Sequence, residues 1–155
     1  MRHFDSNTPR FFNADERPAC ESLLRFFERS PEMRPRRGHF GVLDAAGFVV
    51  GCGGVLQDRE NPNLAILRWG MVSQERHGEG FGRQLLMARL RRMLEVMPDV
   101  QEVILFTSGE VAGFYRHLGF VELGTEPDHY GPGLNQVRFR RAVDSNFKVT
   151  ILGSA

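Results

Sequence analysis

Apolar residues recur along this 155-residue chain with two different periods. Within 16–29 and 81–97 they return every three to four positions, which predicts two amphipathic helices. The runs 39–56 and 63–72 are short, apolar and bounded by turn residues, as is typical of strands. The segment "DAAG" at 44–47 interrupts the first of these runs and predicts a hairpin there.

The second half of the chain continues with a strand at 100–108, a short helix at 109–119 and strands at 120–124 and 135–143. The helix 81–97 connects two strands, and such a crossover makes them parallel. We therefore expect an α/β (α+β) fold with a single mixed, mostly antiparallel central sheet and helices on both faces.

The length of 155 residues is enough for one hydrophobic core, so 1–155 is predicted to be a single domain. Residues 30–38 contain two prolines and are expected to form a loop. Residues 144–155 carry one apolar stretch, "FKVTIL". It predicts an edge strand, which could also pair with a second subunit in a homodimer, or else a flexible tail.

The composition is that of a globular protein, with 41% hydrophobic and 25% charged residues and a net charge of +1. This charge gives no footprint for nucleic acid, and the arginines of helix 83–92 are expected to form a solvated face. No apolar run is long enough for a membrane span or a signal peptide, so we expect a cytoplasmic protein with no membrane partner. Cys20 and Cys52 are expected to be reduced, and no histidine spacing predicts a metal site.

The segment "RHGEGFGRQLL" (76–86) places glycines on every second position just before a helix. Glycines allow the backbone to approach a ligand, and a helix N-terminus favours an anion such as a phosphate. Arg83 could add a charged contact. A P-loop would need a Lys and a Ser or Thr here, and a dinucleotide fingerprint would need a glycine at Arg83. A plain tight turn is the alternative.

Two motifs together resemble the GNAT superfamily of acyl-CoA-dependent N-acetyltransferases. The run His77-Gly78-Glu79-Gly80-Phe81-Gly82 is similar to the family's pyrophosphate loop, [Gln/Arg]-x-x-Gly-x-[Gly/Ala], with His77 at the Gln/Arg position. Downstream, "TSGEVAGFYRHLGFVELG" (107–124) resembles the second hallmark of the family, a short helix carrying "FY" and then "LGF". The resemblance extends over roughly 39–141.

The resemblance implies that acetyl-CoA lies where the parallel strands 63–72 and 100–108 splay apart. Backbone groups near Met71 and Val72 would pair with the pantetheine arm, and Ser108 falls where many members carry an asparagine that contacts the cofactor. Tyr115 falls at the position of the general acid, which protonates the leaving thiolate. The residues implied to bind the cofactor are Met71, Val72, His77, Gly78, Gly80, Phe81, Gly82, Arg83 and Ser108.

The strand 63–72 contains no carboxylate to act as a general base. An ordered water remains an alternative to the candidate bases, which are Asp58, Glu60, Glu75 and Glu110. Arg68 could hold an acidic group of the substrate or pair with a neighbouring acid. Trp69 is expected in the core rather than in a substrate pocket. His129 and Tyr130 belong to a loop that in the family often shapes the acceptor site.

The leading hypothesis is an enzyme that moves an acetyl group from acetyl-CoA to a primary amine, by direct attack in a ternary complex. The amine would belong to a small molecule or a peptide. The first alternative is a non-catalytic acyl-CoA-binding or sensing module. The second is a nucleotide-binding module that shares only the glycine turn.

Overall fold

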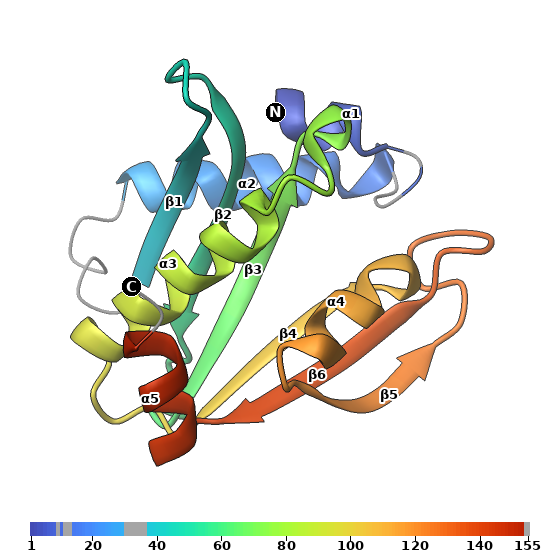
Figure 1. The fold of residues 1–155 in the computed structure, drawn as a ribbon. Helices are drawn as coiled ribbons and strands as arrows, with labels where there is room; N and C mark the ends of the chain where they lie inside the picture. Colours follow the sequence, from blue (N-terminus) through green and yellow to red (C-terminus); the bar gives the residue numbers. More distant parts are fainter. Residues whose placement is uncertain (9, 11–13, 30–36, 154–155) are drawn as a thin grey trace.

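The computed structural model describes residues 1–8, 10, 14–29 and 37–153. A six-stranded sheet runs through it, with helices on both faces (Figure 1). Its elements in chain order are α1 (Arg2–Ser6), η1 (Ala14–Glu16), α2 (Arg17–Arg29), β1 (Arg37–Leu43), β2 (Val49–Gln57), β3 (Leu64–Val72), η3 (Gln74–Arg76), α3 (Phe81–Val96), β4 (Glu102–Ser108), η4 (Gly109–Val111), α4 (Ala112–His117), β5 (Val121–Glu126), β6 (Gln136–Ala142) and α5 (Ser145–Leu152).

The sheet has the strand order β1-β2-β3-β4-β6-β5. The pair β3–β4 is parallel, as a helical crossover through α3 requires, and the other neighbouring strands are antiparallel. This confirms the expected mixed, mostly antiparallel sheet and the predicted hairpin between β1 and β2. In that hairpin the Asp44 carboxylate accepts hydrogen bonds from the backbone N–H groups of Ala46 and Phe48, both at 3.0 Å.

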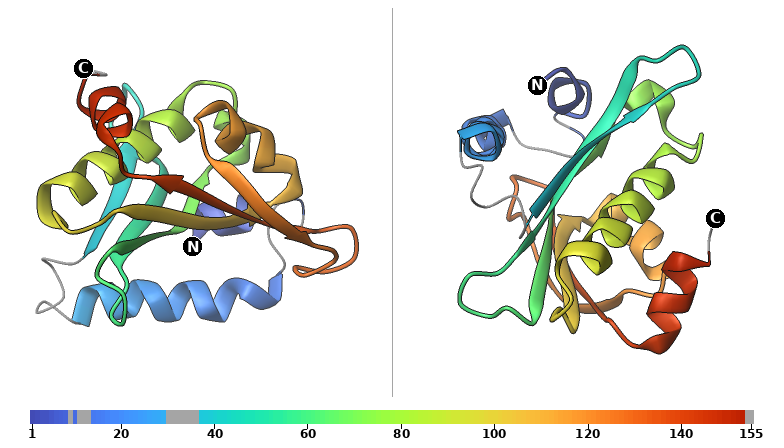
Figure 2. Two further views of the ribbon diagram at one scale, coloured as in Figure 1. Left: turned by 90° about the horizontal axis from the view of Figure 1, so that it is seen from below. Right: turned by 90° about the vertical axis from the view of Figure 1, so that its left-hand side faces the viewer.

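The helices cover the two faces of the sheet unequally. Helices α1 and α2 lie on one face, and α3, α4 and α5 lie on the other (Figure 2). The main hydrophobic core fills the space between the sheet and the second group of helices. Its fully buried members include Val55, Ala65, Leu86, Leu90, Met93, Val103, Phe139 and Ile151.

Strands β3 and β4 separate along their length, and this separation positions the candidate site. They pair only from Leu64 opposite Glu102 to Leu67 opposite Leu105. Beyond this point β3 stays paired with β2, and β4 stays paired with β6, while the two strands diverge from each other (Figure 1). The splayed parallel pair implied by the family resemblance is therefore present.

The outer part of β3 contains a β-bulge. The register with β2 shifts between Cys52 and Gly54, and Trp69 has a φ of 47°. A bulge bends its strand and increases the local twist. Here it lies at the point where β3 leaves β4.

The C-terminal segment differs from the sequence prediction. Residues 145–152 form helix α5, so the expected edge strand is wrong. The Asp144 side chain accepts a hydrogen bond of 2.7 Å from the Phe147 N–H, which caps the helix, and Phe147 and Ile151 are buried in the main core. The short "FKVTIL" run fits either period, and the preceding aspartate was the signal for a helix.

The N-terminal helix α1 was not predicted from the sequence. The expected loop at 30–38 lies mostly outside the described residues, and β1 begins at Arg37. Within the described ranges, no helix has both the length and the apolar character that a membrane crossing requires.

Candidate active site

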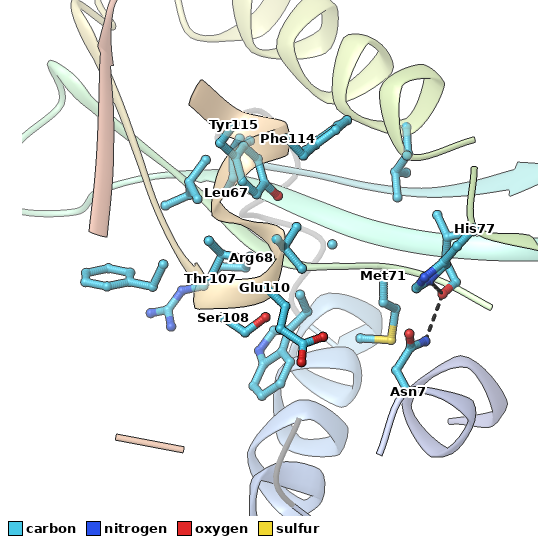
Figure 3. Close-up of a pocket in the computed structure, with 18 of the residues that line it drawn as sticks. Asn7, Leu67, Arg68, Met71, His77, Thr107, Ser108, Glu110, Phe114 and Tyr115 are labelled. Atoms are coloured by element: carbon cyan, nitrogen blue, oxygen red, sulfur yellow. Dashed lines mark hydrogen bonds between the residues drawn. The ribbon is translucent and has the colours of Figure 1, made fainter. Parts of the chain in front are cut away.

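A cavity of about 1060 Å³ opens where β3 and β4 diverge. Its walls come from the outer part of β3, the glycine turn with the start of α3, the end of β4, and α4 (Figure 3). All ten residues predicted to be catalytic or cofactor-binding line this one cavity, although they are spread over 45 positions, from 71 to 115. They are Met71, Val72, His77, Gly78, Gly80, Phe81, Gly82, Arg83, Ser108 and Tyr115.

The glycine turn forms the end of the cavity at the N-terminus of α3. Gly78 and Gly80 have φ angles of 84° and 87°, and Gly80 is the N-cap residue of α3. These left-handed conformations strongly favour glycine. No side chain of a described residue caps α3, whose first intrahelical bond runs from the Gln84 N–H to the Gly80 carbonyl. The N–H groups of the first turn therefore remain oriented toward an incoming anion.

Gly82 needs a different explanation, because its φ lies outside the left-handed region. A Cβ atom at this position would come no closer than 3.9 Å to any neighbouring atom, the Phe114 Cζ. The protein itself thus leaves room for an alanine here. Arg83, in the same first turn, is exposed and makes no ion pair within the described part of the chain.

Arg76 braces this turn against the β1–β2 hairpin. Its guanidinium forms ion pairs with Asp44 at 2.9 Å and with Glu79 at 2.8 Å, and it lies 5.0 Å from the centre of the Phe81 ring. Hydrogen bonds from Arg76 lower the pKa of both the Asp44 and the Glu79 carboxyl groups. Of the two arginines at this turn, Arg76 is therefore engaged in ion pairs that stabilise it. Arg83 is the one whose guanidinium is available to a ligand.

His77 connects the turn to strand β3. Its Nε2 lies 2.9 Å from the Val72 carbonyl oxygen, and because that oxygen only accepts, Nε2 carries the hydrogen. The Asn7 side-chain amide donates to the same carbonyl at 2.8 Å (Figure 3). The Val72 carbonyl therefore already accepts two side-chain hydrogen bonds. A ligand that pairs with β3 would need other backbone groups of this strand.

Tyr115 lies on the short helix α4. Its side chain is buried, and its ring packs on the rings of Phe114, Phe120 and Phe139 at centroid distances of 5.0, 5.7 and 6.0 Å. The ring is therefore fixed on several sides. Tyr115 nevertheless contributes to the cavity lining, beside Phe114 (Figure 3).

Two buried side-chain polar atoms have no hydrogen-bond partner among the described residues, and both belong to cavity-lining residues. They are Ser108 Oγ and Arg89 Nε. Buried polar groups are normally hydrogen-bonded, so an unpaired one beside a cavity suits a ligand. Together with the free N–H groups at α3 and the exposed Arg83, these atoms fit a long ligand that is anionic at one end.

Arg89 corrects the expectation that the arginines of helix 83–92 are all solvated. It is only 2% exposed and lies on the sheet-facing side of α3, with Leu86 and Met93. The spacing of three and four residues to these two neighbours was a signal for burial. The sequence prediction nevertheless placed Arg89 at the surface, because arginine side chains are usually exposed.

The other candidate residues, which are the predicted bases and the residues expected near the acceptor, do not all line the cavity. Of the four predicted bases, Glu110 lines the cavity and is paired with Arg10 at 3.0 Å; the other three, Asp58, Glu60 and Glu75, do not line it. Arg68 lines the cavity and forms no ion pair within the residues that the structure covers. His129 and Tyr130 also line it. The expectation that Trp69 lies in the core rather than in a pocket is wrong, because Trp69 is only partly buried and lines the cavity while packing on Phe4.

Several lining residues were not predicted at all. Among the polar ones, three come from the N-terminal segment, which the family resemblance did not cover, and one comes from α3; they are Asn7, Arg10, Glu16 and Arg89. No periodic or motif signal marks the N-terminal three. Among the described residues there is no group of three or more His, Cys, Asp or Glu side chains that could hold a metal ion.

Comparison with known proteins points to the family that the two sequence motifs resemble. A model of the acetyltransferase (GNAT) domain matches residues 36–122, which is more than half of the chain. No curated protein matches the sequence.

Solved structures match over most of the chain. A protein from Desulfovibrio desulfuricans, provisionally assigned to the GNAT acetyltransferases, has a TM-score of 0.70 at 17% identity, over 92% of this chain and 91% of its own. A provisional phosphinothricin N-acetyltransferase has a TM-score of 0.72 at 19% identity, over 93% and 90%. The spermidine N-acetyltransferase of Vibrio cholerae, solved with CoA and spermine, has a TM-score of 0.61 at 19% identity, over 79% and 74%. At such identities the likeness concerns the fold.

Proposed function

This chain belongs to the GNAT acetyltransferase family, and we propose that it transfers an acetyl group from acetyl-CoA to a primary amine by direct attack. The observation that carries the proposal is the cavity between β3 and β4. It is lined both by the glycine turn at the N-terminus of α3, whose geometry suits an anion, and by the buried Tyr115.

The glycine turn is proposed to hold the pyrophosphate of acetyl-CoA. The N–H groups at 81–83 carry the partial positive charge of the α3 N-terminus, and Arg83 adds a full charge beside them. Gly78 and Gly80 make the turn, and Gly82 leaves the backbone uncovered by a side chain. Arg76 and His77 stabilise the turn from behind, through Asp44 and the Val72 carbonyl.

The pantetheine arm is proposed to run between the diverging strands, pairing with the backbone near Met71 and Val72. Because the Val72 carbonyl accepts two side-chain hydrogen bonds, the arm would use other groups or displace Asn7. The unpaired Ser108 Oγ, at the end of β4, offers a further hydrogen bond to the arm.

Tyr115 is proposed as the general acid of the reaction. The attacking nitrogen forms a bond to the acetyl carbon, and the bond from that carbon to sulfur breaks. Tyr115 gives its hydroxyl proton to the departing sulfur and regains one from water. A phenol has a reference pKa of about 10, close enough to that of a thiol for this transfer.

The acceptor amine is proposed to enter at the part of the cavity lined by Arg68, His129 and Tyr130. Tyr130 is held there by a hydrogen bond of 3.0 Å that the Gln136 side chain donates to its hydroxyl. Arg68 is available to an acidic group on the acceptor. The proton released by the amine passes to water, because Glu110, the one predicted base at the cavity, is engaged with Arg10.

The test is a thiol-release assay with acetyl-CoA and a panel of amines that includes spermidine and phosphinothricin. The chain has two tyrosines, so Tyr115→Phe can be compared with Tyr130→Phe. We expect Tyr115→Phe to lower kcat by about 100-fold or more, since general acids contribute roughly that factor. Tyr130→Phe is expected to act mainly on the KM for the amine.

Unchanged kcat in Tyr115→Phe would remove that residue from the mechanism. Binding of acetyl-CoA with no thiol release across the whole panel would instead favour the non-catalytic acyl-CoA-binding module.

A further inference from the structure

Arg68 is a charged residue of the cavity that has no ion pair within the described residues. It lies on β3 directly after the last position at which β3 pairs with β4, Leu67 opposite Leu105. Its side chain is exposed, and an exposed arginine alone assigns no ligand. The groups around it in the cavity decide which ligand its charge can bind.

Arg68 and Gln136 lie on the same face of the sheet. Leu67 and Leu105 belong to the main hydrophobic core, on the face that α3, α4 and α5 cover. Because side chains alternate along a strand, Arg68 and Ser108 point to the other face. Gln136 is paired with Ser108 across β4 and β6 and therefore shares its face. This face carries α1 and α2 (Figure 2), so Arg68 and Gln136 line the cavity from the same side.

The hydroxyl of Tyr130 adds a second hydrogen-bond donor at this side of the cavity. The Gln136 side-chain amide donates a hydrogen bond of 3.0 Å to the Tyr130 oxygen. Burial raises the pKa of this hydroxyl, so it keeps its own proton and can donate it. No acceptor for that proton is found in the part of the chain that the structure describes. Because Tyr130 lines the cavity, a bound ligand can accept it.

The acidic side chains of the cavity offer little to a polyamine. Glu16 and Glu110 are the only acidic side chains among the lining residues that the structure describes. Glu110 is paired with Arg10 at 3.0 Å, and Glu16 also has a contact within the protein. The ammonium groups of a polyamine would have to compete with Arg10 for Glu110, and the charge of Arg68 would repel them. The unpaired charge at this side of the cavity is therefore positive.

We propose that the acceptor is a small amine that also carries a carboxylate, and that Arg68 and the Tyr130 hydroxyl bind this carboxylate. The inference rests on the proposed function and narrows its substrate class. A guanidinium offers two parallel N–H donors to a carboxylate, and the phenolic hydroxyl offers one more. The reaction is unchanged: the acetyl group moves from sulfur to nitrogen, the amine releases one proton to water, and the sulfur gains one proton to give free CoA.

Matched acceptors that differ only in the carboxylate test this proposal in the thiol-release assay. The sets are alanine and β-alanine with ethylamine, 4-aminobutyrate with propylamine, and phenylalanine with 2-phenylethylamine; spermidine represents the polyamines. At saturating acetyl-CoA, we expect the wild type to show a kcat/KM at least about 10-fold higher for the best carboxylate-bearing amine than for its partner. Hydrogen bonds to a charged group contribute roughly that factor. Spermidine should be the poorer acceptor as well.

Arg68→Met shows whether the carboxylate is bound by this residue. It should raise the KM for the carboxylate-bearing amines by about 10- to 100-fold and change the KM for the other amines by less than about 2-fold. The matched control is Arg138→Met. Arg138 is exposed on the same face, opposite Phe106 and 5.7 Å from its ring, but does not line the cavity. This control should leave both KM values within about 2-fold, and both variants should melt within about 2 °C of the wild type.

A wild type that prefers spermidine or the amines without a carboxylate would overturn the proposal while leaving the acetyl transfer intact. An Arg68→Met variant whose KM rises equally for amines with and without a carboxylate would overturn it too. Failure of the proposed function would look different. The wild type itself would then release no thiol with any of the amines, and the proposed acceptor class would fall with the activity.

Discussion

The glycine turn allows a matched pair of substitutions with opposite expected signs, Gly80→Ala and Gly82→Ala. At Gly80 the φ of 87° is left-handed, which costs a non-glycine residue roughly 1–2 kcal/mol. A Cβ there would meet nothing within 4 Å, so no steric clash adds to that figure. At Gly82 the φ lies outside the left-handed region, and the nearest atom to a new Cβ is 3.9 Å away.

These conformational free energies predict changes in the melting temperature (Tm) and in the affinity for acetyl-CoA. For a domain of this size, about 1 kcal/mol shifts Tm by roughly 2–4 °C. Gly80→Ala should therefore lower Tm by roughly 2–8 °C, or weaken acetyl-CoA binding by about 5- to 30-fold if the turn rearranges locally instead. Gly82→Ala should raise Tm by roughly 1–4 °C, because alanine is the better helix former by about 0.5–1 kcal/mol.

Thermal unfolding and calorimetric titration of acetyl-CoA measure both quantities on the same samples. The wild type and the two variants should fall in the order Gly82→Ala, wild type, Gly80→Ala in stability. A Gly80→Ala variant that melts higher than the wild type and binds acetyl-CoA equally well would refute the left-handed turn, and with it the proposed shape of the phosphate site.

Three further predictions concern other parts of the molecule. Asp144→Ala should lower the free energy of unfolding by about 1 kcal/mol, measured in urea, because α5 loses its cap. Hydrogen bonds from Arg76 lower the pKa values of the Asp44 and Glu79 carboxyl groups. These two ion pairs therefore stabilise the fold at pH values above the ordinary carboxyl pKa values of 3.8 and 4.5, and this stabilisation is lost as the pH falls below them. Thermal melts from pH 6 to pH 3 should show a smaller fall in Tm for Arg76→Met than for the wild type. An equal fall in Tm would contradict the pairing of Arg76 with Asp44 and Glu79. Ser108→Ala should leave Tm unchanged, since Oγ has no partner in the described structure, yet weaken acetyl-CoA binding by about 2- to 10-fold in a calorimetric titration.

Most of the framework followed from local patterns in the sequence. The helical spacing of Leu86, Leu90 and Met93 predicted α3, and the crossover through it predicted that β3 and β4 are parallel. The glycines at 78, 80 and 82 predicted the turn that leads into α3. Family resemblance added the positions that no pattern reveals, such as Tyr115.

The parts that could not be predicted depend on tertiary context. Nothing in the sequence brings Asn7 to the Val72 carbonyl or Arg10 to Glu110, since such contacts form only when distant segments fold together. Arg89 is the instructive case. Its periodicity favoured burial and its charge favoured solvent, and only the structure shows that Gly53 and Gly70 leave room for it.

A titration of acetyl-CoA into the purified protein, with ATP as the control ligand, tests directly whether this cavity is an acyl-CoA site. We predict saturable one-to-one binding of acetyl-CoA and none of ATP under the same conditions. No binding of acetyl-CoA, or binding of ATP with equal affinity, would contradict the assignment of the glycine turn and of the cavity behind it.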